Sequence, residues 1–135
     1  MPSHLDRVKA CRDAVLAGEL VAAESFVALP LDEVARAVNG CGTTVAKFDF
    51  VPDRILGLTI SPACFIHDWD YSEGVSLEHK HASDGRFLLN LLSLIERERG
   101  VVASLLRPFR RRSALLYYEA VTDFGAPAYW AGKPR

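Results

Sequence analysis

The sequence predicts a single all-α domain of 135 residues, and two observations carry that prediction. Several long stretches repeat apolar residues at helical spacing, and glycine or proline separates one stretch from the next. No internal repeat, low-complexity tract or change of composition divides the chain. Residues 1–135 are therefore expected to form one domain with its own hydrophobic core.

Composition and charge exclude several classes of protein. Half of the residues are hydrophobic and the formal net charge is −1, which argues against binding nucleic acid through bulk positive charge. No apolar run is long enough to predict a transmembrane helix. The N-terminus lacks the basic start and apolar core of a signal peptide, so we expect a cytoplasmic protein or one released by lysis. Three cysteines are too few for a disulfide scaffold.

The N-terminal part is expected to contain a helix over residues 4–28, which Gly18 can interrupt, and a short helix over 31–38. A turn at 39–44 and a loop with a short hairpin at 45–60 should follow, because glycine, proline and weakly alternating residues are frequent there. Cys11, in the first helix, is expected to be a small buried hydrophobe.

A helix from residue 61 to about 72 is predicted next. Ser61 is a good N-cap, and Pro62 fits the first helical position. Helical spacing places a polar group of residues on one stripe: Cys64, His67, Asp68 and Tyr71. An apolar group lies roughly opposite: Phe65, Ile66 and Trp69. This helix should be buried on two sides, and the polar stripe indicates a functional site because such groups are costly to bury.

The longest predicted helix covers residues 77–99 and ends at Gly100. Asp84 lies in the centre of its apolar face, which is formed by Leu77, Phe87, Leu88, Leu91 and Ile95. A carboxylate in that position needs a polar partner to stay ionised. If the helix packs antiparallel to the 61–72 helix, Asp84 should hydrogen-bond His67, Tyr71 or both. The opposite face is expected to be polar: Ser83, Arg86, Asn90, Ser93 and Arg97.

Smaller expectations concern the neighbours of these helices. Gly85 should allow another backbone to approach closely, and Asp70 should be solvated. A last helix is predicted over residues 107–123, with the basic run Arg107–Arg112 at its exposed start or against anionic head groups. The aromatic residues of the 128–133 tail should pack under the C-terminus.

Over residues 39–95 the chain resembles the phospholipase A2 superfamily. The matching residues are the Cys41-Gly42 pair, Cys64 three positions before a His-Asp-x-x-Tyr motif, the motif itself (His67, Asp68 and Tyr71), and Asp84 in the next long helix. A wider string of residues also resembles small proteins encoded by bacterial genomes and prophages. The resemblance implies an all-α fold with two antiparallel central helices, flanking helices and an irregular calcium loop.

The resemblance also implies an activity, the calcium-dependent hydrolysis of the sn-2 ester of phospholipids. The protein would bind peripherally to the membrane surface that contains its substrate. His67 would activate a water molecule, with Asp84 orienting the imidazole and Tyr71 in support. Calcium would be held by the Asp68 carboxylate and by backbone carbonyls of Gly40, Gly42 and Thr44. The Gly42 N–H would face the oxyanion. Cys41 and Cys64 occupy positions that form a disulfide in the family.

Two other functions remain open. In place of further glycines, Thr43-Thr44 follows Cys41-Gly42, which leaves room for a non-catalytic protein of the same fold that binds lipid or a protein partner such as a phage structural component. A nucleic-acid-binding helical domain that uses the Arg107–Arg112 run is disfavoured by the acidic balance of the chain. A zinc site at His67, His79 and His81 is disfavoured because positions i and i+2 do not share a helix face.

Overall fold

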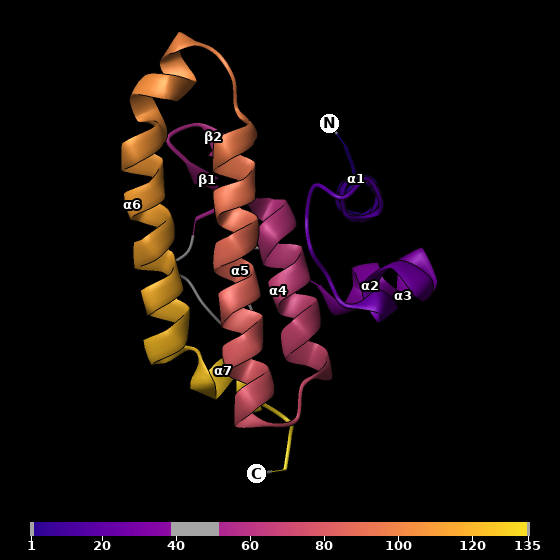
Figure 1. The fold of residues 1–135 in the computed structure, drawn as a ribbon. Helices are drawn as coiled ribbons and strands as arrows, with labels where there is room; N and C mark the ends of the chain where they lie inside the picture. Colours follow the sequence, from indigo (N-terminus) through magenta and orange to yellow (C-terminus); the bar gives the residue numbers. More distant parts are fainter. Residues whose placement is uncertain (1, 39–51, 135) are drawn as a thin grey trace.

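The computed structural model describes residues 2–38 and 52–134, and this part of the chain is mostly helical (Figure 1). The elements are α1 (His4–Leu16), α2 (Glu24–Ala28), α3 (Leu31–Ala37), β1 (Arg54–Ile55), β2 (Leu58–Thr59), α4 (Ser61–Glu73), α5 (Leu77–Arg97), α6 (Val101–Phe124) and α7 (Ala126–Trp130). The strands β1 and β2 form a small antiparallel hairpin. The all-α class is confirmed. No described helix combines the length and apolar character needed to cross a bilayer.

The N-terminal helices are shorter than expected. A capping box begins α1: the Ser3 hydroxyl accepts from the Asp6 N–H, and the Asp6 carboxylate accepts from the Ser3 N–H. The helix ends at Leu16, two residues before Gly18, which has a φ of 80°. This left-handed conformation suits glycine and turns the chain away from the helix axis. The predicted 4–28 helix is therefore two helices, α1 and α2.

The helices α4 and α5 form an antiparallel pair, as predicted, joined by a three-residue connection from Gly74 to Ser76 (Figure 1). The N-cap of α4 is Ile60 and not the predicted Ser61, which is the first helical residue and is buried. At the start of α5, the Ser76 hydroxyl accepts from the His79 N–H. On the other side of α5, α6 runs antiparallel to it.

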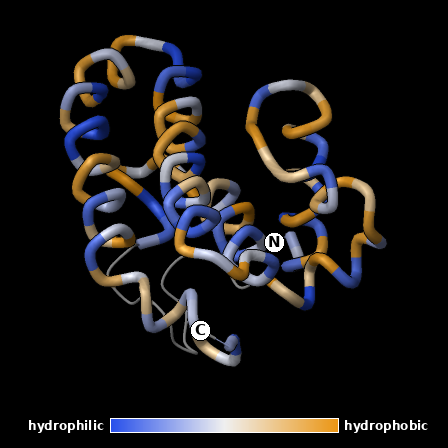
Figure 2. Tube along the Cα trace, turned by 60° about the horizontal axis from the view of Figure 1, so that its bottom comes forward, coloured by the Kyte–Doolittle hydropathy of each residue, from blue (hydrophilic) through white to orange (hydrophobic). Residues whose placement is uncertain are grey.

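Both sides of α4 are buried, as predicted. Its apolar stripe (Phe65, Ile66 and Trp69) belongs to a cluster with side chains of α1–α3. Its other side (Ala63, Cys64 and Tyr71) belongs to a second cluster with α5, α6 and α7. The two views of the chain agree with this arrangement: the N-terminal helices lie to one side of α4–α6 (Figures 1 and 2). The His-Asp-x-x-Tyr motif therefore lies on the helix that joins the two apolar clusters.

The polar face predicted for α5 is partly wrong. Ser83 and Asn90 are buried, not exposed. The Asn90 amide accepts from the N–H of Val21 and donates to its carbonyl, with both distances 2.9 Å. Asn90 therefore provides both hydrogen-bond partners for the backbone of Val21 and ties the irregular segment between α1 and α2 to α5.

Asp70 was expected to be solvated, but it is also buried. Arg86 of α5 donates to its Oδ1 at 2.8 Å, across the interface of α4 and α5. Burial raises the pKa of Asp70, although the Arg86 guanidinium opposes this shift. The sequence indicated exposure because Asp70 falls outside the polar stripe of α4. In the structure, α5 packs against this side of the helix.

The last long helix begins at Val101 and not at residue 107 as predicted. Gly100, with a φ of 104°, precedes it, and Pro108 lies inside it on an exposed side. The predicted helix start at the arginine run is therefore mid-helix. Arg110 is buried and donates to the carbonyls of Ile55 and Leu56, at 3.2 and 2.7 Å, which fixes the β-hairpin against α6.

The short helix α7 was not expected, although the packing of its aromatic residues was. Tyr129 is fully buried; its hydroxyl donates to the Ser76 carbonyl at 2.7 Å and lies 3.2 Å from the Ser76 N–H. An added Cβ at Gly74 would lie 2.4 Å from the Tyr129 hydroxyl. At Gly85 it would meet nothing within 4 Å among the described residues, so the close backbone approach predicted there is not observed.

These two glycines predict opposite effects of one substitution. Gly74→Ala should destabilise the fold by about 1–3 kcal/mol, because the methyl group overlaps the buried Tyr129 hydroxyl. Gly85→Ala should stabilise it by roughly 0.5–1 kcal/mol, because alanine is the better helix former and finds space. Urea unfolding of both variants measures the difference. Equal effects of the two substitutions would contradict the prediction.

Candidate functional site

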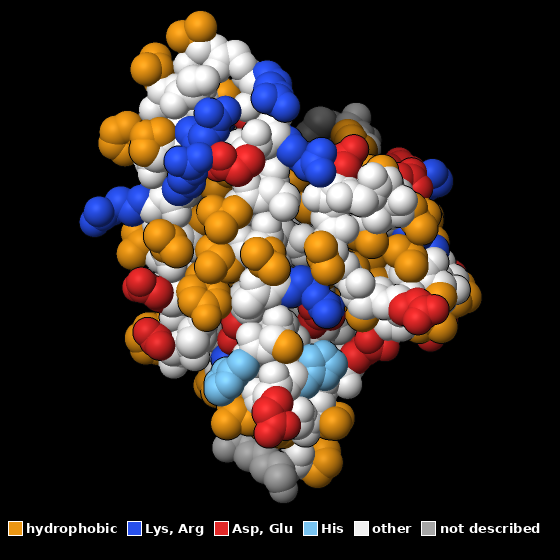
Figure 3. Space-filling model, viewed as in Figure 1, with side chains coloured by type: hydrophobic (Ala, Val, Ile, Leu, Met, Phe, Trp, Pro, Cys, Tyr) orange, Lys and Arg blue, Asp and Glu red, His pale blue; other side chains and the backbone are white. Residues whose placement is uncertain are grey.

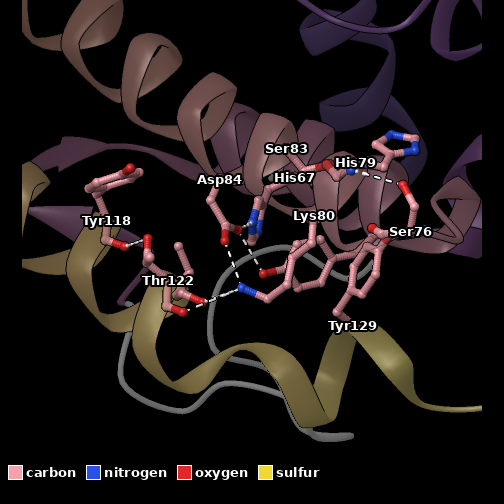
Figure 4. Close-up of polar contacts among 11 residues, drawn as sticks. His67, Ser76, His79, Lys80, Ser83, Asp84, Tyr118, Thr122 and Tyr129 are labelled. Atoms are coloured by element: carbon pink, nitrogen blue, oxygen red, sulfur yellow. Dashed lines mark hydrogen bonds and ion pairs between the residues drawn. The ribbon is translucent and has the colours of Figure 1, made fainter. Parts of the chain in front are cut away.

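The centre of the candidate site is the carboxylate of Asp84, which is 1% exposed between α4, α5 and α6 (Figure 4). His67 Nε2 lies 2.8 Å from its Oδ1, and the Tyr71 hydroxyl donates to the same oxygen at 2.7 Å. Both partners come from α4, one helical turn apart. The sequence prediction that Asp84 meets His67, Tyr71 or both is confirmed, since both make the contact.

The protonation states of this cluster follow from its hydrogen bonds. Burial would raise the pKa of Asp84, but hydrogen bonds from His67, Lys80 and Tyr71 outweigh burial and hold this pKa below its usual value. Burial, together with the nearby Asp84 charge, raises the pKa of Tyr71 far above its usual value. Asp84 is thus a carboxylate and Tyr71 a neutral donor across the physiological range.

These states select one tautomer of His67. A carboxylate can only accept, so the proton between His67 and Asp84 is carried by Nε2. In the neutral ring, Nδ1 is then the basic nitrogen. The imidazole is held by packing as well: its centroid is 4.2 Å from that of Tyr71 and 4.6 Å from that of Phe87. The arrangement fixes both the orientation and the basic atom of a buried histidine.

Lys80 completes the cluster, and sequence reasoning did not find it. Its ammonium, only 2% exposed, donates to Asp84 Oδ2 at 2.8 Å and to the Val121 carbonyl at 3.1 Å, and it lies 3.5 Å from the Thr122 carbonyl (Figure 4). A buried ammonium needs such partners, and the last turns of α6 supply the two carbonyls. The i, i+4 spacing of Lys80 and Asp84 was the signal available in the sequence.

Asp68 follows His67 on α4 but faces a different environment. It is partly exposed and lines a cavity of about 310 Å³. The wall of the cavity also includes Ala37, Tyr71, Ser72 and residues near the C-terminus (Ala128, Tyr129, Ala131, Gly132 and Lys133). The Lys133 ammonium donates to the Tyr71 carbonyl and lies 3.8 Å from the centroid of the Tyr129 ring. The Asp68 carboxylate therefore faces the cavity, whereas the His67 imidazole faces Asp84, as neighbouring positions on a helix predict.

Several predicted site residues lie outside the described part of the chain. These are Cys41 and the three residues whose carbonyls were expected to bind calcium: Gly40, Gly42 and Thr44. The expected oxyanion donor, the Gly42 N–H, is among them. Cys64, the described member of the predicted cysteine pair, is disulfide-bonded. Cys11 is a free, buried thiol, as predicted, and burial raises its pKa to about 12.

Carboxylate, imidazole and thiol groups do not gather into a metal centre in residues 2–38 and 52–134, where no three such side chains could hold an ion. Of the predicted calcium ligands, Asp68 is the one that this part of the chain contains. The described site therefore consists of a buried His67–Asp84–Tyr71–Lys80 cluster and, beside it, a cavity with one carboxylate.

Comparison of the chain with protein-family models, curated proteins and solved structures finds no match.

The buried lysine predicts a large cost of truncation. Lys80→Met should destabilise the fold by about 3 kcal/mol, because it leaves the Asp84 charge buried with one fewer donor. Lys9→Met is the matched control: Lys9 and Asp13 have the same i, i+4 spacing, but their side chains are 61% and 57% exposed. The control should cost less than about 0.5 kcal/mol. Equal shifts in the denaturation midpoint would show that the buried Lys80–Asp84 contact contributes no more to stability than the exposed Lys9–Asp13 pair.

The lowered pKa of Asp84 predicts how stability depends on pH. Because the pKa is lower in the folded state than in the unfolded state, Asp84 stabilises the fold above its unfolded pKa. This contribution is lost as the pH falls from about 4 through the folded pKa. Asp84→Asn should therefore flatten the acid limb of a plot of unfolding free energy against pH. In the unchanged chain, NMR of the carboxyl carbon should show Asp84 titrating below ordinary aspartates; a midpoint above them would contradict the assignment.

Proposed function

We propose that the protein hydrolyses the sn-2 ester of phospholipids in a calcium-dependent reaction, with a water molecule activated by His67 and Asp84. The observation that carries this proposal is the buried His67–Asp84 pair at 2.8 Å, in which a carboxylate fixes the tautomer of an imidazole. Paired groups of this kind are typical of general-base catalysis. The resemblance to the phospholipase A2 superfamily at Cys64, His67, Asp68 and Tyr71 supports the choice of substrate.

In the proposed reaction, Nδ1 of His67 takes a proton from water as the water oxygen attacks the ester carbonyl. The resulting imidazolium is stabilised by Asp84 through the Nε2–H hydrogen bond. Collapse of the tetrahedral intermediate breaks the bond to the leaving alkoxide, which receives the proton from Nδ1. Tyr71 holds Oδ1 of Asp84 throughout, since its own pKa is too high for it to ionise. The products are a fatty acid and a lysophospholipid.

Calcium is the cofactor of the proposal. Asp68 fits this role in chemistry, because hard divalent cations prefer carboxylate oxygens and Asp68 lines a cavity of about 310 Å³. The backbone carbonyls of Gly40, Gly42 and Thr44 would complete the ligand set by the same resemblance. When bound, the metal would supply positive charge next to the oxyanion. The membrane surface remains the proposed partner, with binding peripheral.

A second candidate function rests on Lys80. Its buried ammonium lies against Asp84, so the carboxylate has a positive partner before any imidazolium forms. A cluster of this kind can serve as an internal ion-pair network that joins α4, α5 and α6. The corresponding function is that of a non-catalytic phospholipase A2-like protein that binds lipid or a protein partner.

Two neighbouring substitutions separate the proposed roles. His67→Asn should lower ester hydrolysis by about a thousandfold, because no base remains to accept the proton of water. It should leave calcium affinity nearly unchanged, because the imidazole is not a proposed ligand. Asp68→Asn should lose both calcium binding and hydrolysis, because it removes the only carboxylate of the proposed ligand set. Calorimetry with calcium and hydrolysis of phospholipid vesicles measure the two properties.

The outcomes distinguish the two candidate functions. Calcium binding and hydrolysis by the unchanged chain, with the losses given above, support the esterase. Absence of both properties at millimolar calcium would favour the non-catalytic protein. Activity of the His67→Asn variant equal to that of the unchanged chain would show that the mechanism is wrong even if calcium binds.

A further inference from the structure

The outer side of α6 is apolar and exposed. Four side chains form one stripe on it, opposite the buried residues of the helix: Val102, Leu105, Phe109 and Leu116, which are 68%, 68%, 63% and 51% exposed. Their spacing of three, four and seven residues keeps them on one side of the helix. Val101, at the tip of the α5–α6 hairpin, adds a fifth exposed apolar side chain. We call these five residues the α6 stripe.

Arginines lie within and beside the α6 stripe. Residues 96–118 contain six arginines, of which Arg110 is buried, and two glutamates, although the whole chain has a net charge of −1. Arg112 lies within the stripe and Arg99 at the hairpin tip, and both are exposed. Arg111 and Arg107 lie on a side of α6 that faces Glu96, at 2.5 and 3.9 Å. Figure 3 shows basic side chains beside apolar ones over α6.

We propose that the α6 stripe inserts into the surface of an anionic phospholipid bilayer, with Arg99 and Arg112 against the lipid phosphates. A helix that combines an exposed apolar stripe with arginines lies in the interface of an anionic membrane. The absence of any acidic residue from Arg99 to Tyr118 fits a negatively charged partner. The proposal rests on the proposed function for its lipid partner, but it assigns the contact to a particular surface and to lipids of negative charge.

This surface is separate from the candidate site. The stripe residues lie on the side of α6 opposite Ala114 and Val121, which pack toward the interior. The hairpin tip, where the stripe begins, is further away: Arg97 lies 13 residues after Asp84, a distance of about 20 Å along α5 at 1.5 Å per residue. The cavity beside Asp68 is lined by C-terminal residues and by α4, not by the α6 stripe. Substitutions in the stripe can therefore change membrane binding without touching the His67–Asp84 cluster.

The experiment measures flotation of the full chain with vesicles in EDTA, so that no hydrolysis is required. Vesicles of phosphatidylcholine with phosphatidylglycerol should bind the chain, and vesicles of phosphatidylcholine alone should bind it much more weakly. Leu105→Ser with Phe109→Ser should weaken binding by about tenfold or more, because affinity scales with inserted apolar area. Leu16→Ser with Val21→Ser is the control, since both residues are exposed on the N-terminal helices and their linker; it should bind normally.

Charge and lipid composition give an independent test. Arg112→Gln should weaken binding to the anionic vesicles by about fivefold, because an arginine near such a surface contributes about 1 kcal/mol. Higher salt should weaken binding of the unchanged chain. Circular dichroism and thermal unfolding confirm that each variant folds. Hydrolysis of a monomeric short-chain phospholipid should be the same for the stripe variants and the unchanged chain. If the unchanged chain does not hydrolyse this substrate, the proposed function is contradicted, but the result on vesicle binding still stands.

Three results would overturn the proposal. The first is failure of the unchanged chain to bind anionic vesicles, and the second is equal binding to neutral and anionic vesicles. The third is a dimer in sedimentation that the Leu105→Ser and Phe109→Ser substitutions separate into monomers, because the stripe would then be covered by a second copy of the chain.

Discussion

The satisfaction of one buried carboxylate organises the centre of this fold. Asp84 has no solvent to stabilise its charge, so His67, Tyr71 and Lys80 must all reach it. These contacts determine the relative position of α4 and α5, and Lys80 extends the constraint to the last turns of α6 through Val121. A shift of α5 by a single turn would take Asp84 away from His67 and Tyr71 and Lys80 away from the carbonyls of α6, although Lys80 and Asp84 would remain paired with each other. The cluster therefore selects one register among the several that apolar packing alone would allow.

The two apolar clusters depend on this register. α4 contributes Phe65 and Trp69 to the cluster with α1–α3 and Ala63 and Tyr71 to the cluster with α5–α7. Because one helix serves both clusters, a rotation of α4 would disturb the N-terminal helices and the candidate site together. Arg86 and Asp70 add a second polar contact between α4 and α5, so the pair is held at two places along its length.

Sequence reasoning found the parts of the structure that depend on local spacing. The stripes of α4 and the position of Asp84 follow from helical periodicity, and the contact with His67 and Tyr71 follows from the need of a buried carboxylate for donors. The contacts it missed depend on distant segments. Nothing near Asn90 indicates that Val21 will lie against it, and nothing near Arg110 indicates the carbonyls of Ile55 and Leu56. The start of α6 was misplaced because Pro108 was taken as the first turn of a helix in which it is an interior residue.

The reach of Lys80 to the end of α6 has a consequence for the order in which the chain folds during synthesis. His67 and Asp84 are 17 residues apart, whereas Lys80 and Val121 are 41 residues apart. Because chains fold from the N-terminus as they emerge, the α4–α5 pair can form while the end of α6 is still being made. At that stage the lysine has the carboxylate but not the two carbonyls. The ion pair between Lys80 and Asp84 is then open to water, and it becomes buried only when α6 docks. In a nascent chain, the His67–Asp84 pair would thus form first, and the Lys80–Asp84 pair would be shielded from water last.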